Sequence, residues 1–151
     1  MKTRNLVLKI VAAVLCAVSI LPLFMSFIAL RNGDYRARFK FAEFAGVTDS
    51  LVVISKILFI TSIVLAMVLL VSLVLQFIFK NEILNWVVIG TGVVMMITAT
   101  LCFVSTLLYC LSISELGTYV WFPSFGSYLL VFIGVVAPVC AFISNYETIE
   151  K

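Results

Sequence analysis

Four long apolar segments, separated by short polar breaks, make up most of the chain. A helix that crosses the roughly 30 Å hydrocarbon core of a bilayer needs about 20 apolar residues. Four segments meet that length, over about 6–30, 51–79, 83–113 and 121–144. Only Lys80, Asn81 and Glu82 separate the second from the third, so we expect these two to form an antiparallel hairpin. The pattern predicts four membrane-spanning helices in a single domain over residues 1–151.

Small residues recur every seven positions within these segments. They are Ala12, Ser19 and Ser26 in the first, Ser55 and Ser62 in the second, Gly92, Ala99 and Thr106 in the third, and Ser127, Gly134 and Ala141 in the fourth. A seven-residue period keeps one side of each helix turned inward when helices cross at about +20°. We therefore expect an all-α integral membrane protein, folded as a left-handed four-helix bundle with these residues as packing positions.

Aromatic and basic residues alternate strictly in the loop between the first two segments. One side carries Tyr35, Phe39 and Phe41, and the other carries Arg36, Arg38 and Lys40. A period of two predicts a strand. The loop after the third segment adds Tyr119, Trp121 and Phe122, which also favour strands. We expect the two loops to pair as a two-stranded cap on the bundle. Equally, the aromatic residues could lie among the lipid headgroups with the basic ones on lipid phosphates.

Composition narrows the possible functions. The chain is 64% hydrophobic and 11% charged, whereas a soluble domain has about a quarter of its residues charged. It has no histidine, which excludes histidine metal sites and Ser–His or Cys–His catalysis. The acidic residues fall in loops and tails, which argues against ion-coupled transport. The cysteines are dispersed in apolar segments as small filler: Cys16, Cys102, Cys110 and Cys140. We expect no enzyme, no metal and no cofactor.

Lys56 is the charge that lies most clearly inside a predicted span. Its long side chain could extend to the headgroup region, as lysines near helix ends commonly do. Alternatively it could reach Glu115 and form an ion pair that ties the second helix to the third. The sequence leaves both possibilities open.

The basic residues give little information on orientation. If the N-terminus is cytoplasmic, five of the ten basic residues lie on the cytoplasmic side and five on the outer side. The cytoplasmic five are Lys2, Arg4, Lys9, Lys80 and Lys151. Because the first helix usually dominates and its tail is basic, we expect both termini in the cytoplasm. The first apolar segment is too long for a signal peptide, so we expect it to remain as an anchor. The compact loops fit a bacterial plasma membrane.

Exposed aromatic and arginine residues are typical anchors of protein interfaces. We therefore expect an accessory subunit or organiser that contacts lipid and binds another membrane protein, or a second copy of itself, through the two loops, and no nucleic acid. The alternative is a small oligomeric channel or carrier whose path is lined by the serines and threonines of the small-residue stripes. The layout looks like claudin- or tetraspan-type topology. The Trp and paired-Cys pattern of claudin first loops and the Cys-Cys-Gly motif of tetraspanins are absent, so no family is assigned.

Overall fold

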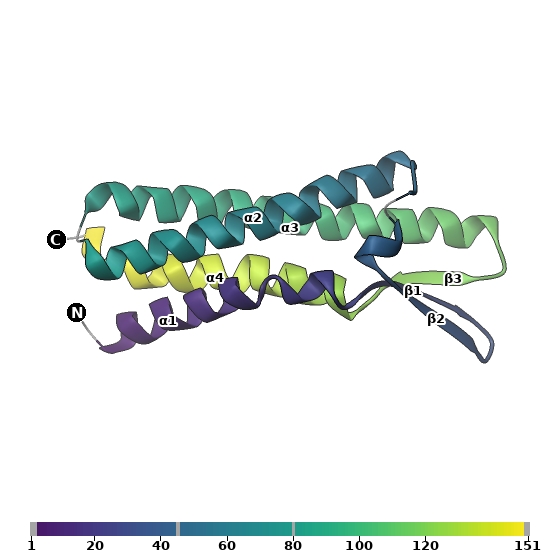
Figure 1. The fold of residues 1–151 in the computed structure, drawn as a ribbon, viewed down its shortest axis with the longest axis horizontal. Helices are drawn as coiled ribbons and strands as arrows, with labels where there is room; N and C mark the ends of the chain where they lie inside the picture. Colours follow the sequence, from purple (N-terminus) through teal and green to yellow (C-terminus); the bar gives the residue numbers. More distant parts are fainter. Residues whose placement is uncertain (1–2, 45, 80, 150–151) are drawn as a thin grey trace.

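Four helices run side by side, and a small antiparallel sheet stands at one end of them (Figure 1). This computed structural model describes residues 3–44, 46–79 and 81–149. The helices are α1 (Thr3–Val18), α2 (Ser50–Ile78), α3 (Glu82–Leu116) and α4 (Phe125–Ile149), and the strands are β1 (Ser26–Asn32), β2 (Tyr35–Lys40) and β3 (Val120–Pro123). Short 3-10 turns, η1 (Leu21–Leu23) and η2 (Phe41–Phe44), precede β1 and follow β2.

The prediction of four long apolar helices is confirmed. By length and composition, the four segments that could each cross a membrane are Thr3–Leu23, Ser50–Ile78, Glu82–Leu116 and Phe125–Tyr146. Helix α3 has 35 residues and is roughly 50 Å long at 1.5 Å per residue, well above the thickness of a hydrocarbon core. The last turns of α3 therefore continue beyond the other helices, and the sheet lies beside them (Figure 1).

The first helix is shorter than the predicted 6–30 span: α1 ends at Val18, about twelve residues earlier than expected. The hydroxyl of Ser19 donates a hydrogen bond to the carbonyl of Cys16 at 2.6 Å, and the Ser19 amide donates to the same carbonyl at 3.2 Å. Pro22 then lacks the amide hydrogen that a continuing helix would need. The apolar residues that follow form the buried strand β1, which hydropathy alone does not distinguish from a helix. Similarly, the predicted fourth span began at residue 121, but residues 120–123 are β3.

The predicted two-stranded cap is wrong in its pairing. The sheet has three strands in the order β2-β1-β3, so the two loop strands, β2 and β3, do not pair with each other. Each pairs with β1, which was expected to be helical. A two-residue turn joins β1 to β2 between Asn32 and Tyr35, and Gly33 has a φ of +55° there. That backbone conformation favours glycine, as at the first central position of a type II′ hairpin turn.

An aromatic layer attaches the sheet to the helices. Phe41 stacks on Phe59 of α2 with ring centroids 4.1 Å apart, and Phe27 meets Phe59 edge to face at 5.1 Å. Phe39 stacks on Trp121 at 5.6 Å. These aromatic rings lie on the side of the sheet that faces the helices. The basic side chains of β2 consequently point to the opposite side.

The predicted packing positions lie in the interior of the bundle. All of them are buried except Ser26, which is half-buried at the start of β1. Within the helices, several of their hydroxyls bond to a carbonyl of the same helix, for example Ser62 to Leu58 at 2.8 Å and Thr106 to Cys102 at 2.8 Å, whereas the Ser127 hydroxyl donates to β1. Such bonds satisfy the hydroxyls without water. This arrangement favours helix packing over a pore lining as the role of these residues.

Gly134 of α4 marks a close approach to α3. A Cβ at this position would overlap the Cβ of Ala99, which cannot rotate away. Gly134→Ala should therefore lower the free energy of unfolding by about 1–2 kcal/mol, because the two helices must separate. Thermal unfolding in detergent measures this.

Gly90→Ala is the matched control, because a Cβ at Gly90 meets nothing within 4 Å. Its midpoint should stay the same or rise, since alanine favours a helix more than glycine does. Adding Ala99→Gly to Gly134→Ala should restore much of the lost stability. An equal loss for both glycine variants would contradict the close approach.

Candidate functional site

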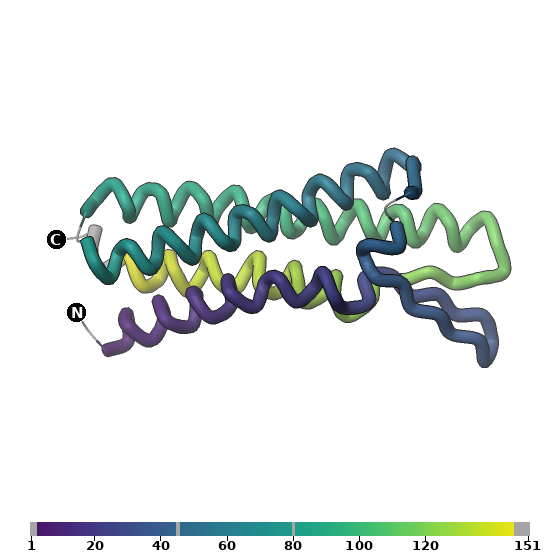
Figure 2. The backbone as a smooth tube through the Cα atoms, in the orientation of Figure 1, coloured from purple at the N-terminus to yellow at the C-terminus, as the bar shows by residue number. Residues whose placement is uncertain are grey.

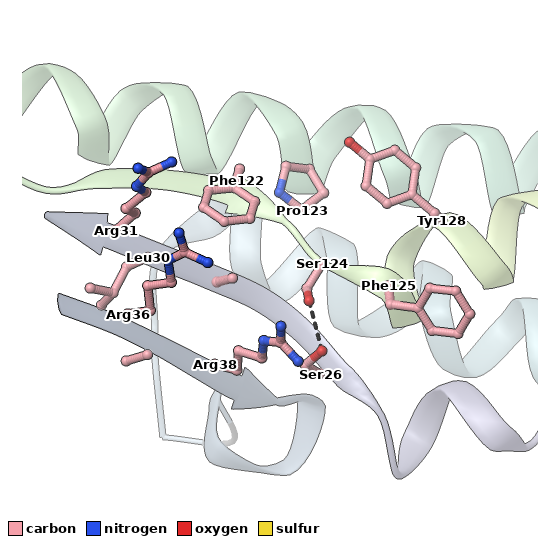
Figure 3. Close-up of a pocket in the computed structure, with 12 residues that line it drawn as sticks. Ser26, Leu30, Arg31, Arg36, Arg38, Phe122, Pro123, Ser124, Phe125 and Tyr128 are labelled. Carbon is pink, nitrogen blue, oxygen red and sulfur yellow. Dashed lines mark hydrogen bonds between the residues drawn. The ribbon is translucent and has the colours of Figure 1, made fainter. Parts of the chain in front are cut away.

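The side of the sheet that faces away from the helices bounds an open groove of about 650 Å³. Strands β1 and β2 form one wall with three arginines, Arg31, Arg36 and Arg38 (Figure 3). The opposite wall comes from β3 and the first turn of α4, and it carries aromatic rings. The groove therefore has a basic wall and an aromatic wall.

The strand register places the arginines together. Arg31 on β1 lies directly opposite Arg36 on β2, and Arg38 lies two positions further along β2, opposite Ala29. All three have exposed side chains, and none makes an ion pair or side-chain hydrogen bond with another residue that the structure describes. Like charges directly across a sheet repel each other. The groove is consequently a concentrated positive surface without a carboxylate among its lining residues.

The far end of the groove lies where α4 begins. The hydroxyls of Ser26 and Ser124 are 2.7 Å apart and hydrogen-bonded, which links the start of β1 to the start of α4 (Figure 3). Phe125 and Tyr128 are 62% and 52% exposed on the first turn of that helix. A Cβ at Gly126 would meet the Ser26 carbonyl at 2.8 Å, so glycine allows β1 to pass close to the helix.

A second, smaller hollow of about 290 Å³ lies near the free tip of the sheet. Its lining comes from β1, β2, β3 and the residue before β3: Leu30, Tyr35, Tyr119 and Trp121. Tyr35 is 62% exposed and Tyr119 is 43% exposed. The β1–β2 hairpin extends away from the bundle here (Figure 2). The tip of the sheet therefore presents an aromatic surface close to the end of α3.

The remaining contact candidates divide between the two sides of the sheet. Phe39, Phe41 and Trp121 are half-buried in the aromatic layer against the helices. Phe122 is exposed and lines the arginine groove. Lys40 is exposed outside the groove, and its backbone amide donates to the Glu43 carboxylate at 2.8 Å.

Comparison of the chain with family models, with curated proteins and with solved structures gives no match. The site must be interpreted from its own chemistry. Within residues 3–44, 46–79 and 81–149, no group of three or more His, Cys, Asp or Glu could hold a metal ion. The basic groove can bind an anion through guanidinium groups, which hydrogen-bond oxyanions in a planar, two-pronged geometry.

Lys56 extends toward the sheet end of the bundle. Its ammonium group donates a hydrogen bond to the Val47 carbonyl at 2.9 Å, in the loop before α2. Glu115 is exposed near the end of α3, and its ion pair with Lys56 stays a prediction. Lys9, in α1, is only 7% exposed and was not singled out from the sequence. Three of the basic residues that were expected on the cytoplasmic side lie outside the described residues: Lys2, Lys80 and Lys151.

The sequence-based prediction missed most of the groove, since its contact candidates there were Arg36, Arg38 and Phe122. Arg31 was not a candidate because the apolar run before it was assigned to a helix, and Phe125 and Tyr128 were not because they lie inside the predicted fourth span. The signal that could have found Arg31 is the dipeptide Gly33-Asp34, because Gly at the first of two turn residues is typical of a type II′ hairpin. A two-residue turn at Gly33 would have placed Arg31 opposite Arg36.

The repulsion between Arg31 and Arg36 predicts that Arg36→Glu stabilises the sheet. The new carboxylate would face Arg31 and replace a repulsive pair with an attractive one, worth about 0.5–1 kcal/mol. Amide hydrogen exchange of β1 and β2 in a neutral detergent should slow by about two- to fivefold, and the effect should shrink in high salt.

Lys40→Glu makes the same charge change on the same strand, but Lys40 lies opposite Ser26. This control should leave the exchange rates nearly unchanged. Equal stabilisation by both variants would mean that net charge, and not the Arg31–Arg36 pairing, is responsible.

Proposed function

We propose that this chain is a non-enzymatic integral membrane protein, an accessory subunit or organiser that binds another membrane protein at the tip of its sheet. Four helices long and apolar enough to span a bilayer support the membrane location. Outward-facing apolar residues on these helices, such as Val64, Ile97 and Phe132, suit contact with lipid tails. The left-handed bundle geometry belongs to the same proposal.

The aromatic hollow at the sheet tip is the observation that carries the partner assignment. Tyr35 and Tyr119 expose large parts of their rings beside half-buried Trp121. Tyrosine and tryptophan at a hollow are the residues on which binding energy at protein interfaces concentrates. The β1–β2 hairpin, which contributes to the lining of the hollow, extends beyond the nearby ends of α1 and α4 (Figure 1), so a partner's extramembrane segment can reach it.

The proposal includes an orientation, which the basic N-terminal tail supports. Helix α1 begins and α4 ends at the end of the bundle opposite the sheet (Figure 1). With the termini in the cytoplasm of a bacterial cell, as the basic N-terminal tail favours, the sheet lies outside the plasma membrane. The partner would then be held on the outer surface.

The channel or carrier alternative receives less support. Its path requires the small-residue stripes to meet water, whereas Ala12, Ala99 and Ser62 are almost completely buried within one bundle. Ser55 and Ser105 hydrogen-bond to each other at 2.8 Å across α2 and α3. Both observations suit a packed interior.

The test is purification of the tagged protein in a mild detergent, with mass spectrometry of co-purifying proteins. The wild-type protein should retain a companion in a fixed stoichiometry. Tyr35→Ala/Tyr119→Ala should reduce its recovery at least about tenfold, because two anchors of the interface are lost.

Tyr146→Ala is the matched control, since Tyr146 is 64% exposed on the opposite end of α4. It should leave the companion bound. Retention of the companion by the double variant would move the interface away from the sheet tip. Purification without any companion would contradict the accessory-subunit assignment.

A further inference from the structure

We propose that the arginine groove binds the headgroup of an anionic phospholipid, with phosphate on Arg31, Arg36 and Arg38 and the upper part of an acyl chain against Phe125 and Tyr128. This inference rests on the proposed membrane location. It concerns the opposite side of the sheet from the aromatic hollow and does not require a protein partner.

Unbalanced positive charge is the first reason. Arg31 and Arg36 face each other across two strands, and Arg38 follows on the same side. No acidic residue lines the groove among the residues that the structure describes: Asp49 caps α2 through the Leu51 amide, and Glu43 accepts from the Lys40 amide. The nearest carboxylate along the chain, that of Asp34, is exposed in the turn between β1 and β2 and is not part of the lining. An oxyanion between the arginines would turn repulsion into charge-assisted hydrogen bonds.

The position of the groove at the start of an apolar span is the second reason. Phe125 is the first residue of the apolar span Phe125–Tyr146, and it lines the same groove as the arginines. The groove therefore crosses the boundary between the sheet and the apolar part of the chain, the level at which lipid phosphates lie. A freely soluble inorganic anion has no apolar part that would contact the aromatic end of the groove.

The shape of the lining is the third reason. Figure 3 shows the arginine side chains on one side and the rings of Phe125 and Tyr128 toward the other. Ala29, only 3% exposed, lies on the central strand opposite both Arg38 and Phe122, and its small side chain leaves room for a headgroup between them. One end of the groove is charged and the other apolar, as in the ligand.

The test uses the full chain reconstituted in nanodiscs of phosphatidylcholine and phosphatidylglycerol at seven to three, followed by release into mild detergent and native mass spectrometry. The wild-type protein should retain one phosphatidylglycerol in preference to phosphatidylcholine. Arg36→Gln/Arg38→Gln should weaken retention at least about tenfold, because two guanidinium contacts are lost. Arg36→Lys/Arg38→Lys, which keeps the charge but not the two-pronged geometry, should fall between them.

Lys40→Gln is the matched control, because Lys40 lies on the same strand outside the groove. It should retain the lipid as the wild type does. Circular dichroism should show an unchanged fold for the double variant; if it does not, Phe125→Ala/Tyr128→Ala provides a second test, with weaker retention expected.

Equal retention by the wild type, Arg36→Gln/Arg38→Gln and Phe125→Ala/Tyr128→Ala would overturn the site. Displacement of the lipid by millimolar inorganic phosphate, with phosphate bound as tightly as the lipid, would assign the groove to a soluble anion and also overturn it. Failure of the wild type to enter nanodiscs would contradict the membrane location itself. If the protein inserts properly but the arginine substitutions do not change lipid retention, only this inference is contradicted.

Discussion

The carbonyl group of Phe27 joins the sheet to the helices. It accepts hydrogen bonds from the Ser124 amide at 2.9 Å and from the Ser127 hydroxyl at 2.6 Å, while the Phe27 ring packs against Phe59. One residue of β1 therefore fixes the start of α4 and contacts α2. Together with the Ser26–Ser124 hydrogen bond and the aromatic layer, this junction fixes the position of β1 relative to the helices, and both sides of the sheet depend on that position.

The two sides of the sheet follow from the strand period. Successive side chains of a strand point to opposite sides, so a strand that alternates aromatic and basic residues separates the two chemistries. The aromatic side packs on the bundle through Phe41 and Phe59. Because of the strand period, Arg36 and Arg38 therefore face away from the bundle. Attachment of the sheet and its positive surface are thus consequences of the same alternation.

The sequence was sufficient for the helices but not for the sheet. Length and hydropathy predict four spans because a bilayer imposes one minimum length on every crossing helix. They fail at Phe27–Leu30, since a buried strand and a buried helix are equally apolar. The side to which Arg36 and Arg38 point was predictable from local alternation. The groove was not, because its second wall comes from residues about a hundred positions later in the chain, such as Phe125 and Tyr128.

The order of the strands also constrains how the protein can be made. Strand β1 is synthesised early, yet it pairs with β3, and Ser26 bonds to Ser124, 98 residues further along. Until α3 and β3 have been synthesised, one edge of β1 has unpaired backbone groups, the kind of edge that attracts other strands. A chain interrupted before residue 120 would keep that edge exposed. Completion of the sheet is therefore a structural mark that distinguishes a finished molecule from a truncated one.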